Sequence, residues 1–173
     1  MKRFYIPFSL FLLLAFKGVA IDLLPTKLLE SKLILIPHWV FVFLVLIAIF
    51  YDEESTHASI IYSAIFGLLI DIVYTDILGV YMFSYAVGIY IVYVLKKLLH
   101  TNFFVTIILT IVGISISEIL ISIIYSVIGI TYLNVDEYVM YRLIPTILSN
   151  VIFVIILYPL AKRHLMQWRD YVK

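Results

Sequence analysis

The sequence predicts an all-α polytopic membrane protein built as a six-transmembrane-helix bundle. Of its 173 residues, 65% are hydrophobic and only 13% are charged, and its mean hydropathy is +1.15. Soluble domains are about half apolar and about one-quarter charged, so this composition indicates a chain embedded in lipid. The hydrophobic residues also form successive runs that approach the length needed to cross a bilayer, which is about 20 residues per helix.

Polar breaks between the apolar runs set the expected helix boundaries. Pro25 and the polar stretch after it end the first run, and a loop with three acidic residues at 52–57 ends the second. The expected helices comprise residues 4–24, 33–51, 58–74, 78–95, 103–130 and 141–161, followed by a basic cytoplasmic tail at 162–173. The fifth run is long for one crossing, and tilt or a protruding end accommodates it. We therefore expect a single transmembrane domain.

The distribution of Lys and Arg predicts the orientation of the bundle. With the N-terminus inside, eight of the 12 basic residues are cytoplasmic: Lys2, Arg3, Lys96, Lys97, Lys162, Arg163, Arg169 and Lys173. The other four are three outside and one within the first helix, namely Lys27, Lys32, Arg142 and Lys17. The excess of positive charge on the cytoplasmic side of membrane proteins places both termini in the cytoplasm. The tail is expected to lie along the anionic lipid of that leaflet.

Two of the expected helices meet in a short turn between Gly67 and Gly79, and this stretch carries two carboxylates, Asp71 and Asp76. Ser63, Gly67 and Asp71 follow one another at intervals of four, which places them in one small and polar stripe on a helix. A carboxylate that faces lipid costs several kcal/mol, so Asp71 is expected near an interface, paired, or beside a cavity. Alternatively, Asp71 is a helix-end residue that only reaches the headgroups.

A second polar set lies in the last two expected helices. Glu118 stands a little past the middle of the fifth helix, where a carboxylate requires a partner, a proton or water. Arg142 and Asn150 fall on one face of the last helix, and Pro145 is expected in its first turn, where proline costs no helical hydrogen bond. Close helix packing explains the small and hydroxyl residues on these faces equally well.

The expected depths of these charged residues in the membrane predict which of them pair. Asp71 and Asp76 are expected at the same outer level as Arg142, so one of them is the expected partner of its guanidinium. Glu118 lies deeper, and it is expected to be protonated when no cation is close.

Signatures of catalysis and of metal binding are missing from the sequence. It has no His-Glu-x-x-His, no Gly-x-Ser-x-Gly and no Gly-rich phosphate loop followed by Lys. The four His residues are spread over separate loops and helix ends, so each is expected at the interface and none in a shared metal site. The chain has no Cys, and its net charge of +1 argues against a nucleic-acid partner. We therefore expect no catalytic, cofactor-binding or metal-binding residues.

Two segments of the chain resemble the family of the bacterial rod shape-determining protein MreD. They are Gly67-x-x-x-Asp71 running into Leu78-Gly79, and Arg142-x-x-Pro145-Thr146-x-x-x-Asn150 at the start of the last helix. The order and separation of the segments, with the polar Glu118 helix between them, extend the resemblance over nearly the whole chain. None of the matching residues becomes catalytic by this resemblance.

The resemblance implies a non-enzymatic protein of the bacterial cytoplasmic membrane that helps to direct peptidoglycan synthesis in elongating cells. The partners it implies are MreC, the actin-like MreB, and the glycosyltransferase RodA with its class B penicillin-binding protein. The family is also similar in helical arrangement to the S components of energy-coupling-factor transporters. The alternative function is therefore a substrate-binding subunit of such a vitamin transporter, with an outward cavity between the third, fifth and sixth helices.

Overall fold

The computed structural model describes residues 4–22, 33–53, 56–131 and 134–170, and every regular element in these ranges is a helix. The elements are α1 (Tyr5–Asp22), α3 (Trp39–Phe50), α4 (Ala58–Tyr74), α5 (Val80–Leu98), α6 (Phe103–Val127), α7 (Val135–Tyr138), the π-helix η2 (Val139–Leu143) and α8 (Ile144–Asp170). Since α7, η2 and α8 follow one another without a break, the described chain has six helical segments. The predicted all-helical architecture is confirmed.

Three of these segments are long and apolar enough to cross a membrane, namely α5, α6 and the continuous α7–α8 segment. The apolar helices α1, α3 and α4 are shorter. Helix α3 has 12 residues, which amounts to about 18 Å at 1.5 Å per residue. The six residues before it are extended and can add up to about 20 Å, so the two parts together can cross a hydrocarbon core of about 30 Å.

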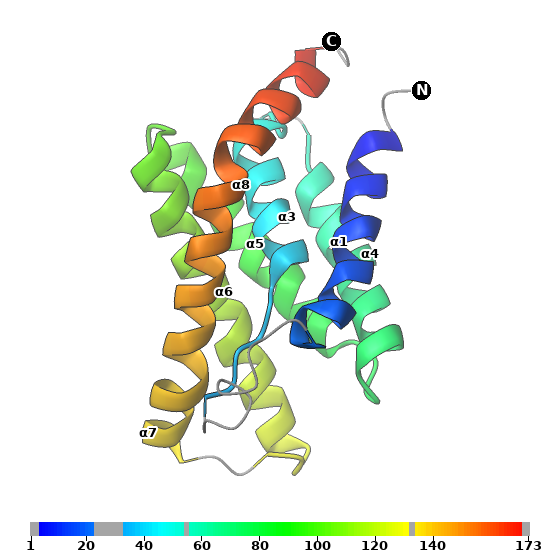
Figure 1. The fold of residues 1–173 in the computed structure, drawn as a ribbon, viewed down its shortest axis with the longest axis vertical. Helices are drawn as coiled ribbons and strands as arrows, with labels where there is room; N and C mark the ends of the chain where they lie inside the picture. The colour runs from blue at the N-terminus through cyan, green and yellow to red at the C-terminus, as the bar shows by residue number, and fades with distance from the viewer. Residues whose placement is uncertain (1–3, 23–32, 54–55, 132–133, 171–173) are drawn as a thin grey trace.

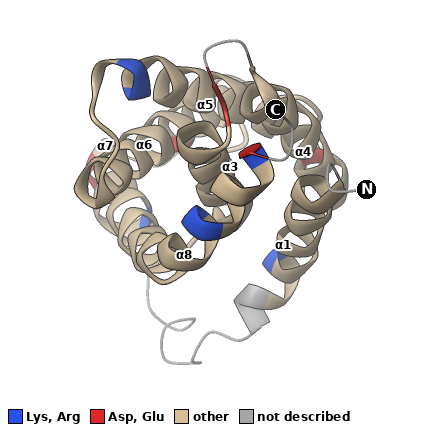
Figure 2. Cartoon of the chain, turned by 90° about the horizontal axis from the view of Figure 1, so that it is seen from above, with Lys and Arg blue, Asp and Glu red and all other residues tan. Residues whose placement is uncertain are grey.

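Helix α3 stands at the centre of the bundle, ringed by α1, α4, α5, α6 and α8 (Figure 2). Every residue from Val40 to Phe50 is buried, which agrees with the rule that a helix apolar on all sides lies inside the protein. The first helix begins and the last helix ends at the same end of the bundle, which we call the termini end (Figure 1). The α4–α5 turn and the connection from α6 to α7 lie at the opposite end, which we call the far end.

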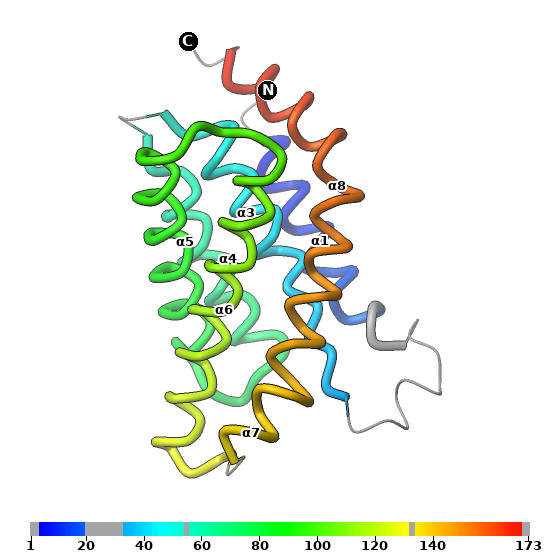
Figure 3. Tube along the Cα trace, turned by 90° about the vertical axis from the view of Figure 1, so that its left-hand side faces the viewer, coloured from blue at the N-terminus to red at the C-terminus, as the bar shows by residue number. Residues whose placement is uncertain are grey.

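The predicted helix at 33–51 is only partly helical, because residues 33–38 are extended beside the first turns of α8 (Figures 1 and 3). Two side chains of α8 replace the missing helical hydrogen bonds. The Asn150 amide donates to the Ile36 carbonyl at 2.9 Å and accepts from the His38 N–H at 2.8 Å. Thr146 Oγ1 bonds the N–H of Ile36 and the carbonyl of Ile34, each at 3.3 Å. Extended backbone inside a membrane protein persists only where it is paired in this way.

The prediction that Pro145 lies in the first turn of the last helix is wrong. The segments α7 and η2 precede α8 without a break, so the helix begins upstream of Pro145. Proline has no N–H to offer to the carbonyl four residues earlier, which here belongs to Tyr141. That carbonyl instead accepts a hydrogen bond from the Ile34 N–H at 2.7 Å. The proline thus frees an acceptor that holds the extended segment in place.

We expect Asn150→Ala to lower the free energy of unfolding by about 2–4 kcal/mol. It leaves the His38 N–H and the Ile36 carbonyl without their acceptor and donor, and each stranded buried group costs about 1–3 kcal/mol. The neighbouring Ser149→Ala is the matched control, because the Ser149 hydroxyl bonds only its own helix in the described structure. Thermal unfolding in detergent measures both variants, and equal losses would contradict the pairing role of Asn150.

Helix α8 continues past the predicted boundary at residue 161 and ends at Asp170. Residues 162–170 of the segment expected to be a tail are therefore helical. Leu165 is fully buried, and the Trp168 ring stacks on Tyr5 of α1 with 5.6 Å between centroids. This part of the basic segment packs on the bundle, and its positive side chains lie at the termini end.

Candidate functional site

A chain of four polar side chains lies inside the bundle, and we call it the charge cluster: His38, Tyr85, Glu118 and Arg142. Glu118 Oε1 lies 2.7 Å from His38 Nε2, and Glu118 Oε2 accepts a hydrogen bond from Arg142 Nε at 2.9 Å. The other ring nitrogen of His38 lies 2.7 Å from the Tyr85 hydroxyl. His38, Tyr85 and Glu118 are fully buried or nearly so, and Arg142 is 13% exposed at its side chain.

The geometry lets every member of the charge cluster satisfy another. A neutral His38 with its proton on Nε2 donates to Glu118 and accepts from the Tyr85 hydroxyl, while Arg142 neutralises the carboxylate. Four elements contribute: the segment before α3, then α5, α6 and η2. Removing one partner of a buried ion pair is costly because the other charge stays buried, so the cluster ties these elements together.

Two predictions about these residues are wrong. Arg142 pairs with Glu118 and not with Asp71 or Asp76, because η2 and α6 line the same hollow and the Arg142 guanidinium reaches inward. The condition for a protonated Glu118, that no cation is close, is not met, because Arg142 pairs with it. His38 is 1% exposed and not interfacial, because the extended segment before it carries the ring into the bundle.

Asp71 performs a different task, at the start of the next helix. Its carboxylate accepts hydrogen bonds from the backbone N–H groups of Gly79, Tyr81 and Met82 at 2.9, 2.9 and 3.1 Å. The first N–H groups of a helix have no partner within it, and an acceptor there also meets the positive end of the helix dipole. Asp71 is thus buried and satisfied as a cap for α5, supplied by α4, whereas Asp76 is exposed.

Gly67 and Gly79 shape the same hairpin. A Cβ on Gly67 would lie 2.7 Å from both the Met82 Cα and the Tyr81 carbonyl oxygen, so only glycine permits this approach of α4 to α5. Gly79 has a φ of +97°, a left-handed conformation that side chains disfavour. The two predicted glycines and Asp71 therefore belong to one helix-turn-helix unit, separate from the charge cluster.

Lys17 of α1 adds a further buried charge. Its side chain is 7% exposed, and its Nζ lies 4.7 Å from the Tyr81 ring centroid and 5.4 Å from that of Tyr74. Aromatic faces attract an ammonium group, more strongly where water is excluded. The Tyr74 hydroxyl donates to the Leu14 carbonyl at 2.7 Å, which fixes one of these rings against α1.

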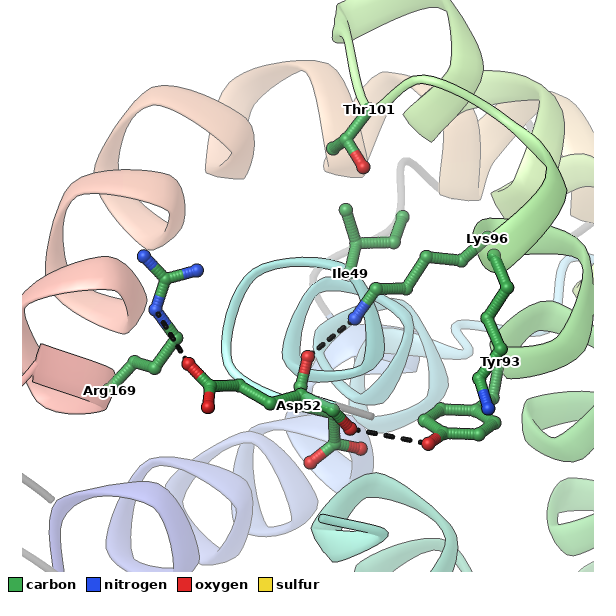
Figure 4. Close-up of a pocket in the computed structure, with 8 residues that line it drawn as sticks. Ile49, Asp52, Tyr93, Lys96, Thr101 and Arg169 are labelled. Atoms are coloured by element: carbon green, nitrogen blue, oxygen red, sulfur yellow. Dashed lines mark hydrogen bonds and ion pairs between the residues drawn. The ribbon is translucent and has the colours of Figure 1, made fainter. Parts of the chain in front are cut away.

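A hollow of about 710 Å³ opens at the termini end above the last turn of α3 (Figure 4). Lys96 Nζ donates to the carbonyls of Ala48 and Asp52 at 2.6 and 2.5 Å, so it closes the C-terminus of α3. The Asp52 carboxylate accepts from the Ala58 and Ser59 N–H groups and caps α4, and burial raises the pKa of this carboxyl above its usual range. Two charges of this hollow, Lys96 and Asp52, thus serve helix ends, and Arg169 Nε lies 3.8 Å from Glu53 Oε1.

A second hollow, of about 350 Å³, lies at the far end between α6 and the α7–η2 segment. Its lining is largely aliphatic, with the hydroxyl residues Ser122, Ser126, Thr131 and Tyr138 among it. His38, Glu118 and Arg142 pair with one another in the charge cluster, and none of them lines this hollow. Within the described ranges, no group of three His, Cys, Asp or Glu side chains is placed to hold a metal ion.

Sequence reasoning missed His38 and Tyr85 as members of the charge cluster. One signal could have found His38: Glu118 required a partner, and His38 follows Pro37 directly at the start of an apolar run. Proline disfavours the helical conformation in the residue before it, so the helix could be expected to begin after Pro37. Tyr85 gave no comparable signal.

The comparisons with known proteins agree with one another. The family described as "rod shape-determining protein MreD" matches residues 2–168. A curated relative, the "Rod shape-determining protein MreD" of Bacillus subtilis (strain 168), is 34% identical over 157 residues, which cover 91% of this chain and 90% of the relative. No solved structure matches, so the predicted similarity to S components has no support from that comparison. The chain thus belongs to the MreD family of rod shape-determining membrane proteins.

Proposed function

We propose that this protein binds MreC in the bacterial cytoplasmic membrane and helps to organise peptidoglycan synthesis for rod cell shape. It acts without catalysis, in a larger assembly with MreB, RodA and a class B penicillin-binding protein. One observation of the structure supports this proposal above others. The side chains of the charge cluster satisfy one another, from Arg142 through Glu118 to His38, which suits a rigid body that presents apolar surfaces to partner helices.

Affinity purification of the tagged full-length chain from native membranes in mild detergent tests this proposal. We expect MreC to co-purify in a stable ratio, and its loss from all preparations would contradict the proposal. Retention of a vitamin or of an ATPase module would instead favour a transporter subunit. Asp76→Ala is a suitable control variant, because the side chain is exposed at the far end and its removal should leave the fold unchanged.

We propose further that the termini end faces the cytoplasm. Lys96 and Lys97 of α5 and the basic residues at the end of α8 lie there, as the positive-inside rule requires of cytoplasmic loops. The chain has no Cys, so single-Cys variants at Asn134 and Lys173 can be labelled without a background. A membrane-impermeant thiol reagent added to intact cells is expected to label position 134 and not position 173. Labelling of both from one side would contradict the six-crossing topology.

A further inference from the structure

The helices around α3 fall into a short group and a long group. Helices α1, α4 and α5 have 18, 17 and 19 residues, which is about 25–29 Å at 1.5 Å per residue. Helix α6 has 25 residues, or about 37 Å, and residues 135–161 form a continuous helical segment of about 40 Å. In the order α1, α4, α5, α6 and α8 each helix contacts the next, so the short helices form one side of the bundle, the short side, and the long helices the other, the long side (Figure 2).

The extra length of the long side lies at the far end. Along the long axis of the bundle, the end of α6 and the start of α7 lie beyond the α4–α5 turn, whereas α1 begins and α5 ends at similar levels at the termini end (Figures 1 and 3). The difference between α6 and α4 is about 10 Å. Tilt does not remove it, because α6 would have to lean by more than about 40°, the upper limit for membrane helices, to fit the height of an upright α4.

The part of the long side that projects past the α4–α5 turn is apolar and exposed. In the sequence from Phe103 to Val135 the only charged residue is Glu118, which is buried. Val127 and Val135 are 82% and 77% exposed. Val127 continues a row of exposed isoleucines along one face of α6, at Ile108, Ile119 and Ile123. This continuity with the lipid-facing surface of α6, and the lack of a charge along it, select hydrocarbon as the cover of the projecting part.

The short side reaches polar residues sooner. The turn after α4 carries the exposed Asp76, and the exposed Lys97 lies in the last turn of α5 at the opposite end. Burying the Asp76 carboxylate in hydrocarbon costs more than changing the thickness of a bilayer by a few Å. Lipid thins beside an apolar span that is shorter than the hydrocarbon core of about 30 Å, and it thickens beside a longer span. The lipid around this bundle is therefore expected to follow both of its sides.

We propose that this protein deforms the bilayer around it, with hydrocarbon thinner than about 30 Å along the short side and thicker along the long side. The leaflet at the far end takes up the difference, so its boundary with the headgroups follows Asp76 on one side and Val135 on the other. The partner of this surface is lipid, and the deformation is a property of the protein alone that needs no partner protein.

Depth-dependent quenching of a fluorophore on single cysteines tests the proposal in the full-length chain, which has no Cys of its own. Val73→Cys marks the far end of α4 and Val127→Cys that of α6, and both side chains are exposed. Each variant is labelled with bimane and reconstituted in phosphatidylcholine vesicles whose acyl chains are brominated near the headgroup or near the bilayer centre. We expect the ratio of shallow to deep quenching to agree within about twofold at the two positions, because both lie near the same hydrocarbon boundary.

A control position and a second pair support the measurement. Ile65→Cys, exposed near the middle of α4, should be quenched more by deep than by shallow bromine. Ile72→Cys and Val135→Cys, also at exposed positions, should show the same agreement as the first pair, and they replace it should one of its variants fail to fold.

Ratios that differ by more than about twofold would overturn the proposal, because a flat bilayer cannot match both sides. If it matched the short side, the probe at position 127 would lie in water, where aqueous iodide reaches it and neither brominated lipid quenches it. If it matched the long side, the probe at position 73 would lie about 10 Å inside the hydrocarbon, and deep bromine would quench it as it quenches position 65. A probe at position 127 that neither lipid nor iodide reaches would also overturn the proposal, since a second copy of the chain would then cover this end.

Discussion

Arg142→Leu is expected to lower the free energy of unfolding by about 3–5 kcal/mol, the range for removing one partner of a buried ion pair. The Glu118 carboxylate would stay fully buried and keep His38 as a partner, while losing the hydrogen bond of 2.9 Å from the guanidinium. Arg142→Lys should recover part of the loss, because Lys restores the charge without the planar fork. Thermal unfolding in detergent and the yield of monodisperse protein measure the effect.

A double-mutant cycle separates this pairing from a general loss of stability. Arg142→Leu combined with Glu118→Leu should differ from the sum of the single changes by about 1–3 kcal/mol, since the two side chains are in contact. The matched cycle of Arg142→Leu with Asp76→Ala should be additive within about 0.5 kcal/mol. Additivity in the first cycle, or coupling in the second, would contradict the pairing that the structure describes.

Asp71→Ala is the second change with a large expected effect, on the order of 3 kcal/mol or more. It removes the acceptor of three backbone N–H groups at the start of α5, and each buried donor left without a partner costs about 1–3 kcal/mol. The stability of Asp71→Asn should lie between that of the unsubstituted chain and that of Asp71→Ala, because the amide keeps one oxygen but turns donors toward the remaining N–H groups. The same unfolding measurement serves here.

Asp76→Ala is the matched control for Asp71→Ala, because the two carboxylates are five residues apart and Asp76 is exposed. It should change stability by no more than about 0.5 kcal/mol. A similar loss in both variants would show that the effect comes from the charge of the turn and not from capping.

The features that depend on local sequence could be predicted, and those that depend on long-range contact could not. Apolar runs and their polar breaks predicted a helical membrane protein, and Gly67, Asp71 and Gly79 pointed to one tight helix-turn-helix unit. The pairing of Glu118 with His38 could not be predicted from the expected depths of charged residues in the membrane. It depends on the extended segment before α3, and that segment exists because Asn150 and Thr146, more than a hundred residues later, satisfy its backbone.

The same reason explains the change in the role of Pro145. From the sequence it marks a helix start, where its missing N–H costs nothing. In the structure its missing N–H leaves the Tyr141 carbonyl free for Ile34, a contact between distant parts of the chain. The segment from Arg142 to Asn150 thus has one task along its length, which is to hold residues 33–38 and the His38 ring against the bundle.

We propose that the interior charges contribute to rod shape by holding the bundle together. The most direct test replaces the family member of a rod-shaped host with this chain carrying Glu118→Gln, Arg142→Lys or Asn150→Ala. Cell width, the amount of folded protein in the membrane and co-purified MreC are measured for each strain. We expect cell width to follow the amount of folded, MreC-bound protein across the variants. A variant that stays folded and retains MreC at the level of the unsubstituted chain, while the cells lose rod shape, would contradict the claim.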